Sequence, residues 1–339
     1  MRVKSYLIGF IILCVILLSG CSRMQLENMN ILTTYFVKKE ESDIVLGGGV
    51  SNVRTLSDSM ADKPVSLIYG KGENLSEAEE KLEKSADHPL FFGGIRAVVI
   101  DERYAKDGIF EFVRGLEKDY KLRSESMVFV TEGDPEKIIT HKAINDFTGG
   151  FAAESLLKAL NDEGKISYVT LSDLFEMMAV KKAGIAISVV DTNDDILSFG
   201  GYALFNKDGK MIDLADNEVS EGITLFLNDV AETEFYKDGY KHEIKKINQK
   251  LSVKKENGKT LLYVKMEFDS GSADEKIKRF AEEKITNAIK KAFKKAQDEN
   301  CDFLNLYRIY QKKYRYEFEK SGYGGLLKDW EIKTQITVK

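Results

Sequence analysis

The spacing of hydrophobic and polar residues predicts that strands and helices alternate through the first half of the chain. Short apolar runs between glycines and polar residues are typical of strands. These runs lie at residues 31–37, 44–46, 65–69, 97–100, 127–131 and 185–190. Apolar residues three or four positions apart predict amphipathic helices. Such helices are expected at residues 76–86, 104–120, 151–162 and 171–183, with another beginning at Pro135.

Two hairpins are predicted in the second half. Apolar runs at 202–205 and 211–214 flank Asn206–Gly209, and two alternating runs flank Asn257–Gly258. Asn-Gly is a strong hairpin signal because both residues readily adopt the left-handed conformation of a tight turn. The alternation in the second hairpin predicts one shared apolar face, made of Ile247, Leu251, Val253, Leu262, Val264, Met266 and Phe268.

The remaining pattern completes an α+β fold. A long helix with an apolar stripe is predicted over 274–297, and a final strand begins near Trp330. The polar run from Thr192 to Asp195 is the best candidate boundary. It divides an N-terminal α+β region, 30–192, from a C-terminal α+β region, 193–339. We therefore expect a multi-domain α+β protein with mostly antiparallel sheets.

The start of the chain predicts a lipid anchor. Residues 6–18 form an apolar core behind two basic residues, shorter than the roughly 20 residues needed to span a bilayer. Leu-Ser-Gly-Cys then ends at Cys21 and resembles the bacterial lipobox. We expect residues 1–20 to be a signal peptide, Cys21 to be the lipid attachment site, and 21–29 to be a lipidated tether. The alternative is an uncleaved membrane helix.

The charge composition disfavours nucleic acid as a partner. The 339 residues carry a formal net charge of −5, so no basic field attracts nucleic acid. Of the three cysteines, Cys14 lies in the predicted leader and Cys21 takes the lipid. Only Cys301 remains, so the mature body contains no internal disulfide.

The usual signals for metals and phosphates are weak. His88, His141 and His242 are far apart in sequence and lack a neighbouring Cys or carboxylate at metal-ligand spacing. The glycines at 47–49 and at 70–72 do not match a phosphate-binding loop and are interpreted as turn glycines. No metal or cofactor is therefore predicted.

Three further groups of residues have competing interpretations. Asp191, Asp194 and Asp195 could bind calcium, but a solvated linker is favoured because no glutamate occupies the EF-hand position. Cys301 could be a reactive thiol, but we interpret it as a small side chain ending the long helix. The basic and aromatic stretch 307–318 is either an exposed amphipathic segment or a contact for lipid head groups or a partner subunit.

Several segments, taken in order, resemble the Ger(x)C family of spore germination proteins, the lipoprotein C subunits of spore germinant receptors. The segments after the lipobox are Gln25–Ile31, Gly72–Ala78, Leu90–Arg96, Val98–Glu102, Arg114 with Asp119 and Leu122–Arg123, Gly200–Phe205, Cys301–Leu304 and Trp330. Two departures stand out. Ser22-Arg23 replaces the family's Trp-Asp, and the family commonly has a histidine where Gly93 or Gly94 stands here.

The resemblance implies three α+β domains and a non-catalytic subunit of a nutrient germinant receptor. It implies two integral membrane partners, an A subunit and a B subunit, and a location on the outer face of the spore inner membrane. A solute-binding lipoprotein of an import system is the alternative, but that class usually has two lobes of parallel βαβ units. A hydrolase is disfavoured because no Gly-x-Ser-x-Gly or His-Glu-x-x-His motif is present.

Overall fold

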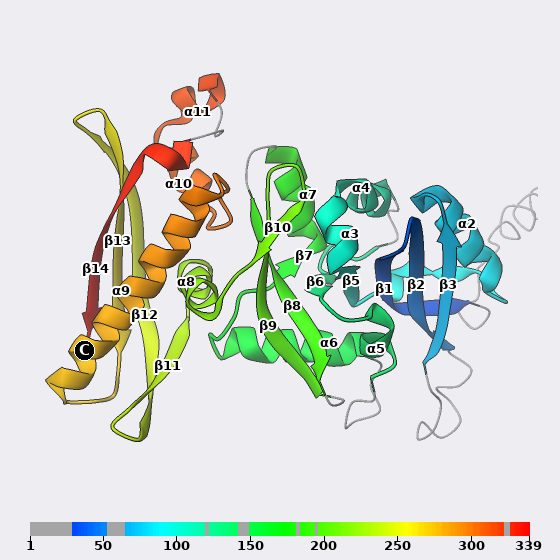
Figure 1. Cartoon of the computed structure of the whole chain (residues 1–339), viewed down its shortest axis with the longest axis horizontal. Helices are drawn as coiled ribbons and strands as arrows, with labels where there is room; N and C mark the ends of the chain where they lie inside the picture. The colour runs from blue at the N-terminus through cyan, green and yellow to red at the C-terminus, as the bar shows by residue number, and fades with distance from the viewer. Residues whose placement is uncertain are drawn as a thin grey trace, which may run out of the picture.

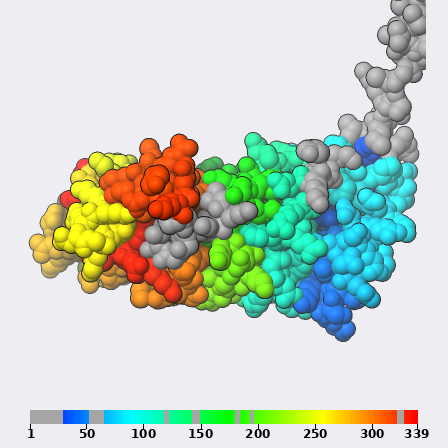
Figure 2. Space-filling model, turned by 90° about the horizontal axis from the view of Figure 1, so that it is seen from above, coloured from blue at the N-terminus to red at the C-terminus, as the bar shows by residue number. Residues whose placement is uncertain are grey.

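The computed structural model of the protein describes residues 29–52, 65–118, 122–141, 149–180, 184–193, 196–321 and 326–339. These residues form two β-sheets that follow one another along the long axis of the molecule (Figure 1). The space-filling view shows early residues at one end of this axis and late residues at the other (Figure 2). The predicted leader, Cys21 and residues 22–28 of the tether lie outside the described residues, so the anchor stays a prediction.

The first sheet, called here the N-terminal sheet, has ten strands in the order β10-β9-β8-β6-β5-β1-β2-β3, with β4 beside β1 and β7 beside β6. The strands are β1 (Asn30–Glu40), β2 (Asp43–Asn52), β3 (Ser66–Gly72), β4 (Leu90–Phe91), β5 (Ala97–Asp101), β6 (Met127–Thr131), β7 (Val169–Thr170), β8 (Ile185–Asn193), β9 (Ile196–Phe205) and β10 (Met211–Leu214). The four central strands β1, β5, β6 and β8 run parallel, whereas the outer pairs are antiparallel.

Helices cover both faces of this sheet, which explains its continuous apolar strands. Every residue of β5 and β6 is buried, as expected for central strands that are covered on both sides. One face packs against α2 (Leu75–Ser85), α3 (Glu102–Asp107), α4 (Phe110–Lys118) and α7 (Leu171–Val180). The other face packs against α5 (Pro135–Ile139) and α6 (Gly149–Asp162). A short 3-10 helix, η3 (Phe92–Gly94), precedes β5.

The single helix predicted over 104–120 is wrong, because the chain breaks between α3 and α4. Gly108 has a φ of 125°, which ends α3. The amide of Ile109 then donates to the carbonyl of Gly209, at 2.9 Å, in the turn before β10. This hydrogen bond connects the break between α3 and α4 to the turn before the edge strand β10. Hydrophobic periodicity describes single helices and does not reveal such a contact.

The predicted boundary at 192/193 falls at the end of β8, just before β9 begins at Ile196. These strands are antiparallel neighbours, with Asn193 opposite Ile196. The N-terminal sheet therefore continues across this position through β9 to β10. The boundary separates two segments of sequence, but it does not separate two sheets.

The second sheet, called here the C-terminal sheet, has four strands in the order β11-β12-β13-β14. The strands are β11 (Glu232–Lys237), β12 (Tyr240–Glu256), β13 (Lys259–Asp269) and β14 (Trp330–Val338). The helices of this half are α8 (Asn217–Leu227), α9 (Glu275–Asp298), α10 (Leu306–Lys313), α11 (Arg315–Ser321) and the 3-10 helix η4 (Leu326–Asp329). The predicted long helix and final strand are confirmed, and β14 pairs in parallel with β13.

The predicted Asn-Gly hairpin is confirmed, with one local error. Asn257 and Gly258 have positive φ angles of 51° and 77° and join β12 to β13. The prediction for Ile247 is wrong, since a β-bulge between Lys246 and Asn248 shifts the register at this position. A shift of one residue moves side chains to the opposite face of a sheet. Ile247 is consequently 56% exposed instead of contributing to the shared apolar face.

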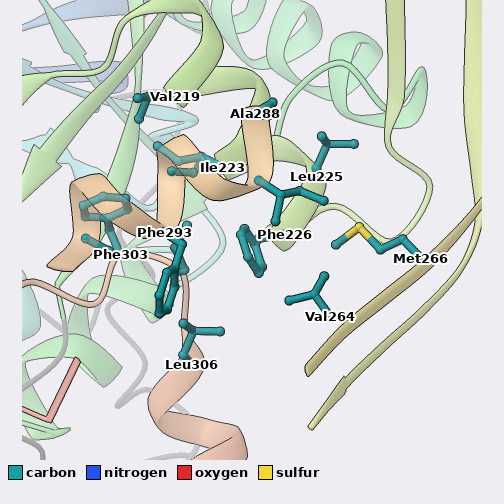
Figure 3. Close-up of a cluster of buried hydrophobic side chains, with 14 of the residues drawn as sticks. Val219, Ile223, Leu225, Phe226, Val264, Met266, Ala288, Phe293, Phe303 and Leu306 are labelled. Atoms are coloured by element: carbon teal, nitrogen blue, oxygen red, sulfur yellow. The ribbon is translucent and has the colours of Figure 1, made fainter. Parts of the chain in front are cut away.

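The core of the C-terminal half lies between its sheet and the helices α8 and α9. In Figure 3, Ile223 and Phe226 of α8 lie near Phe293 of α9, with Val264 and Met266 of β13 beyond them. The same cluster includes Tyr202 and Leu204 of β9, so the core continues into the last strands of the N-terminal sheet. The prediction of a multi-domain α+β fold with mostly antiparallel sheets is confirmed.

Candidate functional site at the junction of the two sheets

A buried polar network joins the two halves of the molecule. The hydroxyl of Tyr202, on β9, lies 2.9 Å from the hydroxyl of Thr224, on α8. It also accepts from the amide of Ser167, at 2.7 Å. Tyr202 is fully buried, and burial raises the pKa of its hydroxyl to about 12. The network therefore holds a neutral hydroxyl between three segments that are distant in sequence.

Asn228 extends this network to the loop that follows α6. Its side-chain amide donates to the carbonyl of Ile166, at 2.6 Å, and to that of Asn161, at 3.0 Å. Its side-chain oxygen accepts from the amide of Val230, at 2.9 Å. One buried side chain thus fixes the loop after α6 to the turn between α8 and β11.

A buried lysine caps the C-terminus of α8. The ammonium group of Lys246, on β12, donates to the carbonyls of Leu225 and Asn228 and to the side chain of Gln249. The last carbonyls of a helix lack partners within the helix, and cationic groups are favoured there. Lys246 is 5% exposed, and desolvation lowers its pKa to about 8.

A second connection lies where α7 meets α10. The guanidinium of Arg308 is 2.6 Å from the carboxylate of Glu176, and the hydroxyl of Tyr307 donates to the same carboxylate at 3.1 Å. These residues line a small cavity of about 130 Å³. Next to it, the buried carboxylate of Asp302 accepts from the amides of Leu306 and Tyr307 and fixes the start of α10.

A wider space at the junction is a cleft between β9, α8 and β11. Its volume is about 630 Å³, within the range of about 300–1,000 Å³ that is common for ligand pockets. Gly200 and Gly201 of β9 form one side, and Glu232–Glu234 of β11 form another. Lys284 of α9 contacts Glu221 of α8 in the cleft, and both contact the hydroxyl of Thr233.

The residues proposed from sequence fall mainly in structural roles. Cys301 is buried and its thiol donates to the carbonyl of Phe205, at 2.9 Å. Burial raises the pKa of this thiol well above its ordinary value, so little thiolate forms near neutral pH. Cys301 therefore packs at the end of α9, as predicted, and connects it to β9.

Both glycine clusters are sites of close packing. A side chain at Gly47 would overlap the ring of Phe36, and one at Gly70 would overlap the main chain of α2 at Ala78. The turn interpretation of both clusters is wrong, because Gly47 lies within β2 and Gly70 within β3. Asp191 likewise binds protein groups, accepting from the Thr131 hydroxyl at 2.7 Å and from the amide of Glu132. Asp194 and Asp195 lie outside the described residues.

The three histidines lie on separate parts of the fold, and the ring of His242 stacks on Phe235 with centroids 5.3 Å apart. Within the described ranges, no group of three or more His, Cys, Asp or Glu side chains is arranged to hold a metal ion. Among the helices that the structure describes, none is both long and apolar enough to cross a membrane.

The basic and aromatic stretch 307–318 divides between core and surface. Tyr307 and Tyr310 are buried, whereas Tyr316 is 76% exposed. Lys313 donates to the carbonyl of Val253, at 2.6 Å, so α10 covers part of the edge of β12. The interpretation as an entirely exposed amphipathic segment is therefore wrong for α10.

Two family models match consecutive parts of the chain, and the division between them lies near the end of β8 and the start of β9. The model described as "Spore germination protein N-terminal domain" matches residues 22–192. The model described as "Spore germination B3/ GerAC like, C-terminal" matches residues 200–339. The chain therefore belongs to the GerAC family of spore germination proteins, in agreement with the resemblance found in the sequence.

Individual relatives agree with this family. Spore germination protein KC of Bacillus subtilis (strain 168) is 22% identical over 366 residues, which cover 94% of this chain and 89% of that protein. The solved structure titled "Crystal Structure of the GerBC protein" matches with a TM-score of 0.55 at 11% identity. That match covers 90% of this chain and 96% of that one. At such low identity the structural likeness concerns the fold alone.

Sequence reasoning missed most of the junction. Tyr202 stands in the predicted strand 202–205 and in a segment that resembles the family, but neither pattern indicates that its hydroxyl contacts residues 22 and 35 positions away. Lys246 carried one usable signal, since it stands two positions after Ile244, where alternation places a buried side chain. No local pattern pointed to Glu176, because its partners lie more than 130 positions along the chain.

Proposed function

We propose that this protein is the non-catalytic lipoprotein subunit of a nutrient germinant receptor, required for triggering spore germination. The observation that carries the proposal is the match of two consecutive spore germination family models over nearly all of the chain after Cys21. The relative in Bacillus subtilis, also named a spore germination protein, matches over 94% of the chain and supports it.

We further propose that Cys21 carries the lipid and that the body lies on the outer face of the spore inner membrane. Its partners there are the integral membrane A and B subunits of the receptor. The lipobox resemblance supports the anchor, and its attachment before β1 would place the N-terminal sheet nearest to the bilayer. Several acyl chains bind a membrane far more firmly than one.

The buried junction supports a role as a rigid connecting element. Its hydrogen bonds join β9, α8 and the loop after α6, so the two sheets are expected to move as one body. A rigid body beside membrane subunits could position them or transmit a change between them. Turnover is not part of the proposal.

Co-purification from spore membranes tests the proposal directly. A tagged copy of the protein is expected to recover two multi-span membrane proteins. In a strain without redundant receptors, deletion of the gene is expected to leave sporulation normal and to abolish germination with at least one nutrient. Recovery of neither membrane protein, or unchanged germination with every nutrient, would contradict the proposal.

A further inference from the structure

The outer edge of β11 carries main-chain groups that face away from its sheet. Asp238 and Gly239 have positive φ angles of 54° and 82° and form a two-residue turn between β11 and β12. In such a hairpin the residues that flank the turn exchange both hydrogen bonds, and every second residue before them faces outward. Glu232, Glu234 and Tyr236 are therefore the outward-facing residues of β11.

One contact in the structure agrees with this assignment. The amide of Glu232 donates to the carbonyl of Gly164, at 2.8 Å, on the side away from β12. Among the described residues, the outward amide and carbonyl of Glu234 have no such partner. Unpaired edge groups are a template for another strand. Gly164 thus pairs with the outer edge of β11 at Glu232, and no described strand pairs with this edge beyond that residue.

The cleft of about 630 Å³ lies directly beside this edge. Its opposite side is a β-bulge in β9, where Gly200 is the extra residue between two register positions of β8. Gly200 is exposed, and Gly201 has a φ of 107°. Glycine in a bulged strand permits close approach of another main chain. Both sides of the cleft therefore present backbone.

The carboxylates that line the cleft already have lysine partners. The lining includes three carboxylates and two ammonium groups, from Glu221, Glu232, Glu234, Lys165 and Lys284. Glu221 pairs with Lys284, the carboxylate of Glu232 lies 3.1 Å from the ammonium group of Lys245, and that of Glu234 lies 2.7 Å from the ammonium group of Lys241. A segment that enters the cleft is therefore expected to bind through main-chain hydrogen bonds to the edge of β11, and not through opposite charge.

We propose that this cleft is a peptide-binding site that receives an extended, polar segment of a partner subunit. The segment adds a strand beside β11, and its main chain pairs with the outward groups of Glu234 and Tyr236. Five residues, from Glu232 to Tyr236, would span about 16 Å at about 3.3 Å per residue. This inference rests on the proposed function, because the receptor complex supplies the partner.

Glu234→Pro is the decisive variant, with Glu234→Gln as its matched control. Proline removes the outward amide, and an edge strand tolerates proline where the amide faces away from the sheet. Glutamine removes the charge and the ion pair with Lys241 but retains the amide. Each is expressed as the tagged, full-length lipoprotein and purified from spore membranes. We expect Glu234→Pro to recover at least tenfold less membrane subunit than wild type, and Glu234→Gln to recover at least a third as much.

The outcomes separate this inference from the proposed function. If wild type recovers no membrane subunit, the proposed function fails and the inference fails with it. If wild type recovers the subunits and Glu234→Pro recovers as much, the inference is overturned while the proposed function stands.

Thermal unfolding of both variants shows whether proline unfolds the domain. If it does, amide hydrogen exchange of the wild-type protein tests strand addition instead. Segment 232–237 of the wild-type protein is then compared in the purified complex and in the isolated body. At least tenfold slower amide exchange in the complex supports strand addition, and equal exchange in the two states overturns it.

Discussion

The hydroxyl oxygens of Tyr202 and Thr224 lie 2.9 Å apart at the point where the N-terminal sheet meets α8. Tyr202 is fully buried and Thr224 is 4% exposed, so water does not compete for this contact. The same phenolic oxygen accepts from the amide of Ser167. A buried donor that loses its partner keeps its full desolvation cost. This single oxygen atom therefore couples β9, α8 and the loop after α6.

Tyr202→Phe is expected to lower the free energy of unfolding by about 1–3 kcal/mol, because it leaves the half-buried amide of Ser167 and the buried hydroxyl of Thr224 without this partner. Urea denaturation followed by circular dichroism measures the change. Tyr236→Phe is the control, since Tyr236 is 72% exposed and its change should stay within about 0.5 kcal/mol. Equal stability of the two variants would show that the junction does not depend on the hydroxyl.

Lys246→Met is expected to destabilise the protein by about 1–3 kcal/mol at pH 7, because it leaves the carbonyls of Leu225 and Asn228 without a donor. The exposed Lys250, four positions along β12, provides the control, and Lys250→Met should have little effect. Chemical denaturation of the three proteins measures the difference. A neutral result for Lys246→Met would mean that water or a rearranged side chain replaces the lysine.

The stability difference between wild type and Lys246→Met should also depend on pH. Desolvation lowers the pKa of Lys246 from 10.5 to about 8 in the folded protein. Between these values the unfolded chain binds a proton that the folded protein has released, so the stability of wild type rises with pH. The difference should be constant below pH 8 and should grow by at most about 1.4 kcal/mol per pH unit from pH 8 to 10.5; this added stability is lost again as pH falls through 8. A difference that is flat over pH 8–10 would contradict the shifted pKa.

Gly222→Ala is expected to destabilise the protein by about 1–3 kcal/mol, because the added methyl group would overlap the carbonyl oxygen of Ala288 where α8 crosses α9. The matched control is Gly115→Ala on α4, where an added methyl group meets nothing within 4 Å. There the substitution should stabilise the helix by roughly 0.5–1 kcal/mol. Thermal unfolding of both variants measures the two opposite shifts. The same sign for both would argue against close helix packing at Gly222.

Cys21→Ala is expected to release the protein from the membrane fraction of spores and to impair germination, because the thiol that would accept the lipid is absent. Far-UV circular dichroism and melting temperature of the body should match those of wild type, since residue 21 precedes β1 and the described cores. Fractionation and mass spectrometry measure both outcomes. An unmodified Cys21 in native protein would refute the anchor, and loss of circular dichroism would refute the separation of anchor and fold.

Helix starts, tight turns and helix faces could be predicted from the sequence, because each depends on residues that are close together in the chain. Asp134-Pro135 predicted the start of α5, and the side chain of Asp134 accepts from the amide of Glu136 as an N-cap. Asn257-Gly258 predicted a hairpin because both residues adopt positive φ. The apolar stripe predicted over 274–297 is the buried face of α9, which includes Ala281, Ile285 and Ala288.

The sequence by itself determined the class of fold, the family and the candidate anchor, because periodicity, turn residues and motif order are local properties that survive in a linear chain. Tertiary structure alone decided the parallel centre of the N-terminal sheet, the break at Gly108 and the reversal of face at Ile247. It also decided the junction, where Tyr202 meets Thr224 and Lys246 caps α8. These features depend on pairing between segments that are distant along the chain, and burial then determines which polar groups must find partners.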